Sequence, residues 1–297
     1  MDIKNHSIYN ELVALGIVNP AAVTRFYPAV RDRDDVGVLR CNQSGVIFLD
    51  RVDHVETSYY ADKEGTSYWS SSDRTAGLRL TWEDDHRRAA QIRELVSDKA
   101  YADVGSGLGG ILDLMKAHAA TIHAVEPQND ARALLKEIGY PAYASIKELS
   151  EQDTKFDLIT LFHVFEHITD PLNSLKMLRK ALKPGGKIFI EVPHAGDALI
   201  SLYNLDAFKK FTFWSEHLVL HTRKSLETYL FAAGFSSVTV SGFQRYPLAN
   251  HLHWLHKNEP GGHVKLPQMR NPALEEAYAA TLSRSDLNDT LIAIATC

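Results

Sequence analysis

The sequence predicts an α/β fold built on a parallel sheet, and three observations support this class. From about residue 85, short apolar runs alternate with segments of roughly 10–15 residues whose apolar side chains recur at helical spacing. Strands separated by helices of this length form βαβ units, in which the strands are parallel. The run 156–162 is apolar enough to be buried on both faces, as the strands of parallel sheets are.

The first 75 residues lack the alternation of strand and helix patterns seen later in the chain, and they are predicted to form an N-terminal appendage. Apolar residues on both sides of a turn at 42–45 predict a hairpin over 36–49, with 46–49 as the return strand. The following stretch, 59–72, is rich in Tyr, Trp and Ser without clear periodicity, and we expect an ordered loop there. The remainder of the chain, 76–297, is predicted to be the main domain.

Within the main domain, strands and helices are expected to alternate. Strands are predicted at 101–104, 121–125, 156–162, 187–192, 238–242 and 290–295. Helices are predicted at 89–96, 111–117, 130–138, 172–182 and 226–233. An insertion, 244–287, separates the last two strands, and its Asn271-Pro272 pair is typical of a helix start.

Composition and charge exclude several classes of protein. Apolar residues make up 45% of the 297 residues and charged residues 23%, as in globular proteins and unlike disordered, collagenous or coiled-coil chains. The net charge of −5 predicts neither a nucleic-acid partner nor binding to an anionic membrane. No apolar run approaches the ~18 residues of a membrane-spanning helix. Two cysteines, Cys41 and Cys297, cannot form a disulfide framework, and the N-terminus makes a poor signal peptide, so we expect a cytoplasmic location.

A glycine-rich turn follows the first strand of the main domain, at residues 103–110. Glycines are needed where a ligand approaches the backbone closely and the turn requires permissive dihedral angles. The spacing fits the dinucleotide fingerprint G-x-G-x-x-G from Gly105, and also the pattern D-x-G-x-G-x-G of S-adenosylmethionine (SAM) enzymes from Asp103. Glu126, which ends the second strand, suits either cofactor because a carboxylate can accept both ribose hydroxyls. A tight turn without a ligand is a third interpretation.

Four motifs, taken in order, resemble those of the class I SAM-dependent methyltransferases. Residues 103–109 are similar to their first motif, and Glu126 is similar to their ribose-binding acidic residue. Three further segments are similar to their fourth-strand motif, the turn before their fifth strand and their antiparallel seventh strand: 156–167, 182–186 and 289–295. The resemblance covers about 85–243 and 288–297. It implies a Rossmann-like, seven-stranded sheet with helices on both faces and SAM as the cofactor. The residues implied to bind SAM are Asp103, Gly105, Ser106, Gly107, Gly109, Glu126, Phe162 and His163.

Further motifs resemble those of methyltransferases of sugar and polysaccharide biosynthesis and of ubiquinone-type O-methyltransferases. These motifs lie at 165–171, 190–193 and 214–217. Some sugar C-methyltransferases of this group carry an N-terminal zinc ribbon. Here only Cys41 remains where a ribbon has its second cysteine pair, and a structural zinc needs four ligands. The resemblance thus implies a metal-free hairpin that serves as a lid or as the surface of a homodimer. Tyr68 resembles the substrate-side tyrosine of the sugar enzymes.

The string His163-x-x-Glu166-His167 allows several interpretations. It matches the inverted zinc-protease signature, but that site needs a stable helix, which Asp170-Pro171 would interrupt. It also resembles the divalent-metal site of small-RNA ribose methyltransferases, with His217 as the distant ligand. A His where that family has a Glu makes Mg²⁺ a poorer fit. We favour a third, metal-free interpretation, in which Glu166 and His167 shape the pocket. A structural role for all these side chains is the remaining alternative.

The pair Glu216-His217 is predicted to supply the catalytic base. Imidazole is the side chain best suited to removing a proton near neutral pH, and a neighbouring carboxylate can orient the ring. A sugar hydroxyl is too weak an acid to attack the methyl group efficiently without such help. A matching Glu-His pair is implicated in base chemistry in sugar C-methyltransferases. Because ligands bind at the carboxyl ends of parallel strands, 163–167 and 214–217 should converge beside the SAM methyl group.

The sequence therefore predicts a SAM-dependent methyltransferase that O-methylates a sugar hydroxyl in nucleotide-sugar, lipopolysaccharide or capsule biosynthesis. Its partner would be a small molecule or a glycan. The alternatives are a sugar C-methyltransferase, a small phenol or quinone O-methyltransferase, a metal-dependent RNA ribose methyltransferase, and a SAM-fold protein that binds without turnover. Four insertion histidines are interpreted as a polar rim of the substrate site or a surface loop rather than a metal site: His251, His253, His256 and His263.

Overall fold

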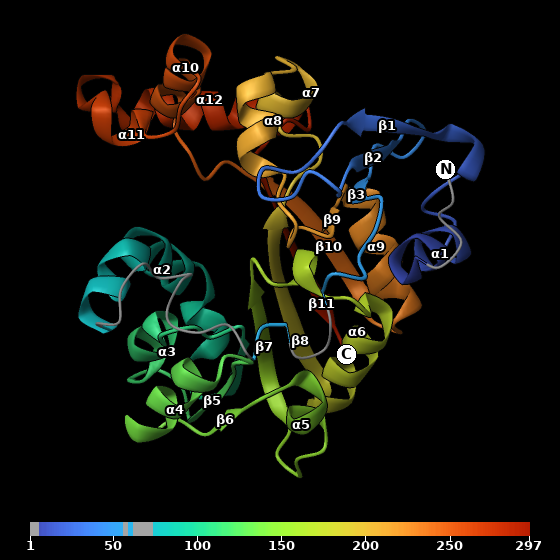
Figure 1. Ribbon diagram of the computed structural model, residues 1–297. Helices are drawn as coiled ribbons and strands as arrows, with labels where there is room; N and C mark the ends of the chain where they lie inside the picture. The colour runs from blue at the N-terminus through green and yellow to red at the C-terminus, as the bar shows by residue number, and fades with distance from the viewer. Residues whose placement is uncertain (1–5, 56–58, 62–73) are drawn as a thin grey trace.

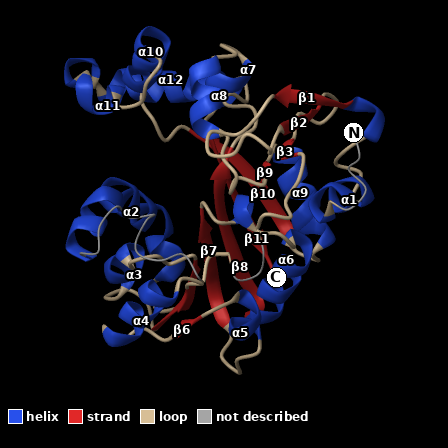
Figure 2. Cartoon of the chain, in the orientation of Figure 1, coloured by secondary structure: helices blue, strands red, loops and turns tan. Residues whose placement is uncertain are grey.

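The computed structural model describes residues 6–55, 59–61 and 74–297. In this part of the chain, a seven-stranded sheet has helices on both faces, and a four-stranded sheet lies near one of its ends (Figures 1 and 2). The strand order of the large sheet is β10-β11-β8-β7-β4-β5-β6. The predicted α/β class and seven-stranded Rossmann-like sheet are therefore confirmed.

Parallel strands form most of the large sheet and bring their carboxyl ends to one edge. The strands are β4 (Ala100–Val104), β5 (Thr121–Val125), β6 (Ala142–Tyr143), β7 (Phe156–Phe162), β8 (Leu182–Pro193), β10 (Ser236–Phe243) and β11 (Thr290–Thr296). Strand β11 runs antiparallel to both of its neighbours, β8 and β10. The chain order reverses between β4 and β7, which is where an open α/β sheet forms its ligand crevice.

Helices cover the large sheet in two layers, each with its own apolar core (Figure 1). One layer contains α2 (Arg74–Val96), α3 (Gly110–Met115) and α4 (Asn129–Glu137); the other contains α5 (Ile146–Ser150), α6 (Pro171–Ala181) and α9 (Arg223–Ala232). Adjacent residues of β7 belong to the two different cores: Leu158 packs in the first and Ile159 in the second. The prediction that this strand is buried on both faces is confirmed.

Two elements begin earlier than their patterns predict. Helix α2 begins at Arg74, although the apolar pattern indicates a helix only from Ala89. In its first turns the large apolar side chains of Leu80 and Trp82 are exposed and do not recur at helical spacing, so the periodicity that marks the later part is missing. Strand β8 begins at Leu182 and includes the expected turn, where Gly185 has a φ of +77°. Its regular pairing with β7 resumes at Lys187.

The small sheet joins the N-terminal segment to the main domain. Its strands, in spatial order, are β1 (Val23–Tyr27), β2 (Val38–Cys41), β3 (Ile47–Leu49) and β9 (Val219–Leu220). The antiparallel pairing of β2 with β3 confirms the predicted hairpin. Strand β9 lies between β8 and α9 in the chain and pairs with β3. Helix α1 (Ser7–Ala14) and the short helix η1 (Pro20–Ala22) precede this sheet.

The segment between β10 and β11 is helical and lies in the upper left of Figure 1. It contains α10 (Leu248–Lys257), α11 (Gly262–Lys265), η3 (Pro267–Met269) and α12 (Pro272–Arg284). Asn271 caps α12 as its sequence predicts, accepting the N–H of Leu274 at 3.2 Å. Helices α7 (Ala198–Ser201) and α8 (Asp206–Thr212) follow β8. Among the helices of the described residues, none has the length and apolar content that crossing a membrane requires.

Candidate functional site

The glycine-rich turn connects β4 to α3 at the carboxyl edge of the sheet. Gly105, Gly107 and Gly109 all have positive φ angles, between +51° and +82°, which L side chains rarely adopt. A Cβ atom on Gly105 would lie 2.3 Å from Cγ2 of Val164, so this position also lacks space for a side chain. The N–H groups of Gly105 and Ser106 donate to the carbonyl oxygen of Val125, which ties the turn to β5.

Two buried carboxyl groups flank this turn. Oε2 of Glu126 accepts the N–H of Gly107 at 2.7 Å, and Oε1 accepts the N–H of Gln128 at 2.9 Å. Each oxygen keeps a second lone pair for a ligand hydroxyl. Asp103 is 2% exposed and accepts the hydroxyl of Thr160 at 2.6 Å. Burial raises the pKa of Asp103 to about 7.

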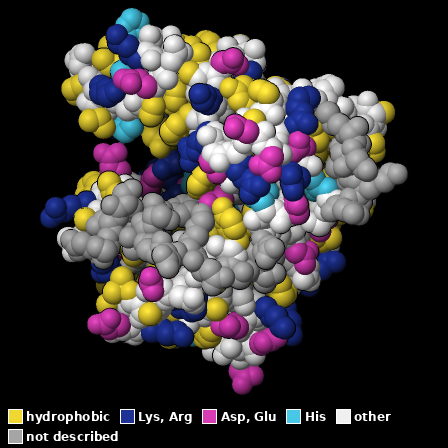
Figure 3. Space-filling view, viewed as in Figure 1, with side chains coloured by type: hydrophobic (Ala, Val, Ile, Leu, Met, Phe, Trp, Pro, Cys, Tyr) yellow, Lys and Arg dark blue, Asp and Glu magenta, His cyan; other side chains and the backbone are white. Residues whose placement is uncertain are grey.

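A cavity of about 890 Å³ runs from this turn toward the insertion helices. Asp103, Glu126, Phe162 and His163 line its turn side. The other side is lined by residues of α8, the loop after it and the segment after β10, among them Phe208, Trp214, His217, Arg245, Tyr246, Asn250, His251, Trp254 and His263. In Figure 3, Lys and Arg side chains and Asp and Glu side chains gather in the hollow beneath the insertion. The volume lies within the range of about 300–1,000 Å³ that ligand sites occupy.

His163, Glu166 and His167 form a cluster directly after β7, in which Glu166 is fully buried and the two histidines are partly exposed. His163 has a φ of +54°, and Phe165–His167 is a short 3₁₀ helix. Nδ1 of His163 lies 3.2 Å from Oε1 of Glu166, and Nε2 of His167 lies 3.8 Å from the same oxygen. Burial alone would raise the pKa of Glu166, but the hydrogen bond from His163 and the adjacent imidazoles outweigh it and hold this pKa at about 2.

His217 joins this cluster from the loop after α8. Its ring centroid lies 5.1 Å from that of His167. Its Nδ1 lies 3.1 Å from the carbonyl oxygen of Thr212. A carbonyl can only accept, so Nδ1 carries the proton and Nε2 keeps its lone pair. Burial, with some help from His167, lowers the pKa of His217 to about 3, so the ring is neutral at pH 7.

Glu216 does not orient the His217 ring as its neighbouring position suggests. The ring hydrogen bond of His217 goes to Thr212, whereas Oε1 of Glu216 accepts the hydroxyl of Tyr59 at 3.2 Å. Side chains of consecutive residues in an irregular loop point in different directions, which explains the difference. Tyr68 lies outside the described residues.

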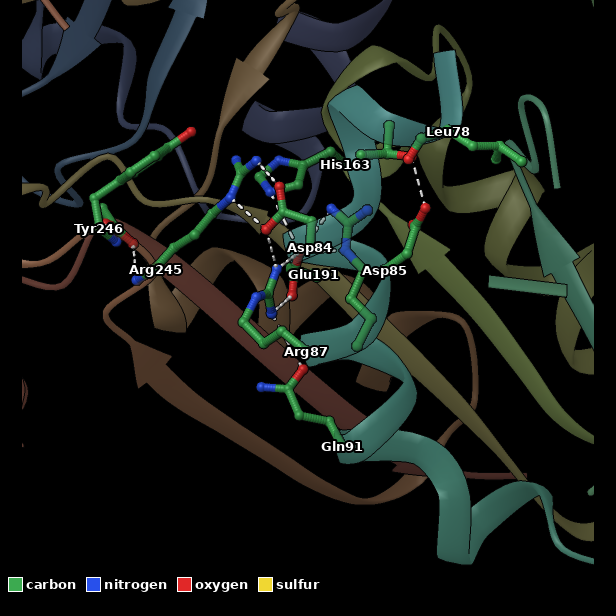
Figure 4. A network of polar contacts seen from close by, with 12 residues as sticks. Leu78, Asp84, Asp85, Arg87, Gln91, His163, Glu191, Arg245 and Tyr246 are labelled. Carbon is green, nitrogen blue, oxygen red and sulfur yellow. Dashed lines mark hydrogen bonds and ion pairs between the residues drawn. The ribbon is translucent and has the colours of Figure 1, made fainter. Parts of the chain in front are cut away.

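The structure reveals a charged network that the sequence analysis missed (Figure 4). Glu191 of β8 is fully buried, accepts hydrogen bonds from Arg87 and Arg88 of α2, and lies 3.4 Å from Nε2 of His163. Burial opposes a charged imidazole, but Glu166 and Glu191 together raise the pKa of His163. Arg245, which follows β10, pairs with Asp84 of α2. Helix α2 is therefore tied both to the sheet and to the segment after β10.

The insertion histidines are not in a surface loop. His251, His253 and His256 are on α10, and the first two are buried. His251 Nδ1 lies 2.7 Å from the hydroxyl of Tyr278, and His253 pairs with Glu259. Only two of the four, His251 and His263, line the cavity. The sequence shows that these side chains are polar, but its pattern does not indicate helix α10, in which two of them are buried.

The residues at the turn fit SAM. The positive-φ glycines let a ligand approach the backbone, Glu126 has lone pairs left for the ribose hydroxyls, and Asp103 is a buried carboxyl group beside them. The cluster of Glu166, His167 and His217 also consists of residue types that bind metal ions. Ligand atoms of Glu166, His167 and His217 lie within 4.8 Å of one another. Oε2 of Glu166 is buried and has no hydrogen-bond partner among the residues that the structure describes.

Comparisons with known proteins agree with this geometry. Residues 76–240 match the family described as Methyltransferase domain. The ubiquinone biosynthesis O-methyltransferase of Acinetobacter baylyi is 31% identical over 121 residues, which cover 38% of this chain and 48% of that protein. The enzyme of the same name from Coxiella burnetii is 30% identical over 148 residues, covering 46% and 61%. The chain thus spans about half the length of the curated relatives it matches.

Two solved structures are similar in fold. A SAM-dependent methyltransferase from Archaeoglobus fulgidus has a TM-score of 0.50 at 18% identity, covering 77% of this chain and 96% of that one. A putative methyltransferase from Haloferax volcanii, solved in complex with the Trm112 activator, has a TM-score of 0.51 at 14% identity, covering 75% and 95%. At these identities the likeness shows the fold alone.

Proposed function

Since this chain belongs to the class I SAM-dependent methyltransferases and SAM is its cofactor, we propose that it O-methylates a sugar hydroxyl with His217 as general base. The observation that carries this proposal is the hydrogen bond between Nδ1 of His217 and Thr212. It fixes the tautomer in which Nε2 can accept a proton, on a residue that lines the cavity. Bound SAM supplies an electrophilic methyl group on its sulfonium.

The surrounding side chains suit the proton transfer. The low pKa of His217 keeps the ring neutral, the form that a base needs, but also makes it a weak base. Glu166 is ionised and close enough to raise the proton affinity of His217 by charge. It therefore stabilises the imidazolium that forms when His217 takes the hydroxyl proton. His167 is adjacent to both and lines the pocket.

The lining of the far side of the cavity supports a polyhydroxylated acceptor. The partly exposed Arg245, Tyr246 and His263 offer hydrogen-bonding groups there, and Trp214 offers aromatic surface. A few placed polar groups among aromatic side chains are typical of sites that orient a polar small molecule. The same groups suit a nucleotide-linked sugar or the end of a glycan.

A second acceptor class has its own support. The curated relatives include ubiquinone biosynthesis O-methyltransferases, so a small phenol or quinone is the alternative acceptor. A phenol is a stronger acid than a sugar hydroxyl and depends less on a base. A divalent ion held by Glu166, His167 and His217 is the alternative to base catalysis. It is favoured by their spacing and by Oε2 of Glu166, which has no partner in the described part of the chain.

Transfer of tritium from methyl-labelled SAM to a panel of acceptors tests the proposal. The panel contains nucleotide sugars, oligosaccharides, catechols and RNA. We expect label in a nucleotide sugar or an oligosaccharide, at an oxygen that mass spectrometry of the product identifies. Label in catechols alone would replace the sugar with a phenol, and label on a carbon would replace O-methylation with C-methylation.

A further inference from the structure

The loop that carries His217 is held from outside by the N-terminal segment. We call residues 213–218 the base loop; it connects α8 to β9. Ser215, at the centre of this loop, is 2% exposed. Its N–H donates to Oδ1 of Asp32 at 2.9 Å, and its hydroxyl donates to Oδ2 at 2.6 Å. One carboxylate thus receives both donors of Ser215.

Other residues of the N-terminal segment reinforce this contact. The N–H of Arg31 donates to the carbonyl oxygen of Phe213 at 3.0 Å, and the guanidinium carbon lies 4.6 Å from the centre of the Trp214 ring. Nε2 of His54 donates to the carbonyl oxygen of Ser215 at 2.7 Å. The N–H of Leu49 donates to the carbonyl oxygen of Leu218 at 3.1 Å. Backbone groups of Phe213, Ser215 and Leu218 therefore have partners within residues 31–54.

The local hydrogen bonds of the base loop do not make it a regular element. Residues 213–218 belong to neither a helix nor a strand. The N–H of Phe213 donates to Lys209 and that of His217 to Trp214. The N–H of Leu218 is shared between Glu166 and Glu216. Hydrogen bonds to a carboxylate are about twice as strong as neutral ones, so the two bonds that Asp32 accepts are strong contacts to the loop from outside it. A displacement of about 1 Å in a catalytic group can cost about 10²-fold in rate.

We propose that Asp32 is a positioning residue that holds the base loop and thereby fixes His217 in the cavity. This inference rests on the proposed function. On this account the N-terminal segment contributes to catalysis by positioning the base loop. Asp32 does not line the cavity, and it acts on the reaction only through Ser215.

Amide hydrogen exchange tests whether Asp32 holds the base loop, and this experiment needs no methyl acceptor. The variants are Asp32→Ala, Asp32→Asn and the control Asp35→Ala, which removes an exposed acid of the same segment that pairs with Arg33 and Arg51. With S-adenosylhomocysteine as the bound probe, we expect exchange in peptides covering 213–218 to rise at least about tenfold in Asp32→Ala. We expect a smaller rise in Asp32→Asn, which keeps an acceptor oxygen, and no change in the control. Unchanged exchange in Asp32→Ala would overturn the inference. Asp32 is itself exposed, so the variants should fold.

A double-mutant cycle tests whether Asp32 affects catalysis through His217. It uses the acceptor that the labelled-SAM panel identifies. We expect Asp32→Ala to lower kcat by about 10- to 100-fold with SAM affinity unchanged, and to cause no further loss in a His217→Ala background. Equal losses in both backgrounds, or a normal kcat, would show that Asp32 does not act through His217. Normal turnover of His217→Ala alone would instead defeat the base assignment, while the exchange experiment would still decide whether Asp32 holds the loop.

Discussion

Oε2 of Glu126 accepts the backbone N–H of Gly107 at 2.7 Å, so a residue that follows β5 holds the turn that follows β4. The same carboxylate faces the cavity and has lone pairs left for ribose hydroxyls. Glu126 therefore shapes the glycine-rich turn, and we propose that it also binds the cofactor.

Glu126→Gln should weaken SAM binding about 10- to 100-fold. The amide replaces one acceptor oxygen with a donor, which opposes the N–H of Gly107 or Gln128 and removes a charge-assisted bond to ribose, ~1.5–3 kcal/mol. Calorimetric titration with SAM measures the change, and Glu137→Gln on the exposed side of α4 is the control. Equal SAM affinity in the two variants would contradict this role.

Asp103→Asn should stabilise the protein at alkaline pH in the absence of SAM. The pKa of Asp103 is about 7 in the folded protein and about 3.9 in an unfolded chain, so the unfolded state loses this proton first as pH rises. The carboxyl group therefore lowers the free energy of unfolding progressively between about pH 4 and pH 7. Asn cannot titrate and still accepts the Thr160 hydroxyl.

Urea unfolding at pH 5 and pH 8 measures this difference. The free energy of unfolding of Asp103→Asn should exceed that of the wild type by on the order of 2–4 kcal/mol at pH 8, and by less at pH 5. Asp153→Asn, at an exposed position, is the control. If the difference in free energy of unfolding between Asp103→Asn and the wild type were the same at both pH values, the raised pKa of Asp103 would be contradicted.

Glu191→Gln should destabilise the fold strongly. The change leaves two half-buried guanidinium groups, those of Arg87 and Arg88, without their buried counter-ion. Removing one partner of a buried ion pair costs about 3–5 kcal/mol. Glu151→Gln removes the acid of an exposed pair with Lys147 and should cost less than ~1 kcal/mol. Similar midpoints of thermal unfolding for the two variants would show that the buried network adds little to stability.

Turnover should not depend on a divalent metal. If His217 acts as a base, dialysis against a chelator leaves the rate unchanged, and added Mg²⁺ or Zn²⁺ has no effect. The spacing of Glu166, His167 and His217 makes this a sharp test, because the same atoms could hold an ion. Loss of activity with chelator and recovery with one of the ions would replace base catalysis with a metal mechanism.

Much of the fold was predictable because its signals are local. The apolar run of β7, the glycines after β4 and the cap at Asn271 each depend on neighbours within a few residues. The missed elements lack such a signal. The apolar side chains in the first turns of α2 do not recur at helical spacing, and β6 and β9 have only two residues each, so none of the three forms a recognisable pattern.

The site was less predictable because its decisive contacts join distant residues. Glu191 meets Arg87 across 104 positions of sequence, and nothing near either residue indicates the other. Asp32 meets Ser215 across 183 positions. The sequence placed a His and a Glu side by side at 216–217, but the partner that orients His217 is a backbone carbonyl, which no residue type reveals.

The rate of methyl transfer by His217→Ala tests the central claim most directly. Single-turnover kinetics with labelled SAM and the acceptor that the wild type methylates measure the chemical step. We expect the rate to fall by roughly 10²–10⁴-fold with SAM affinity unchanged, because only the proton acceptor is lost. A rate equal to that of the wild type would show that His217 is not the base.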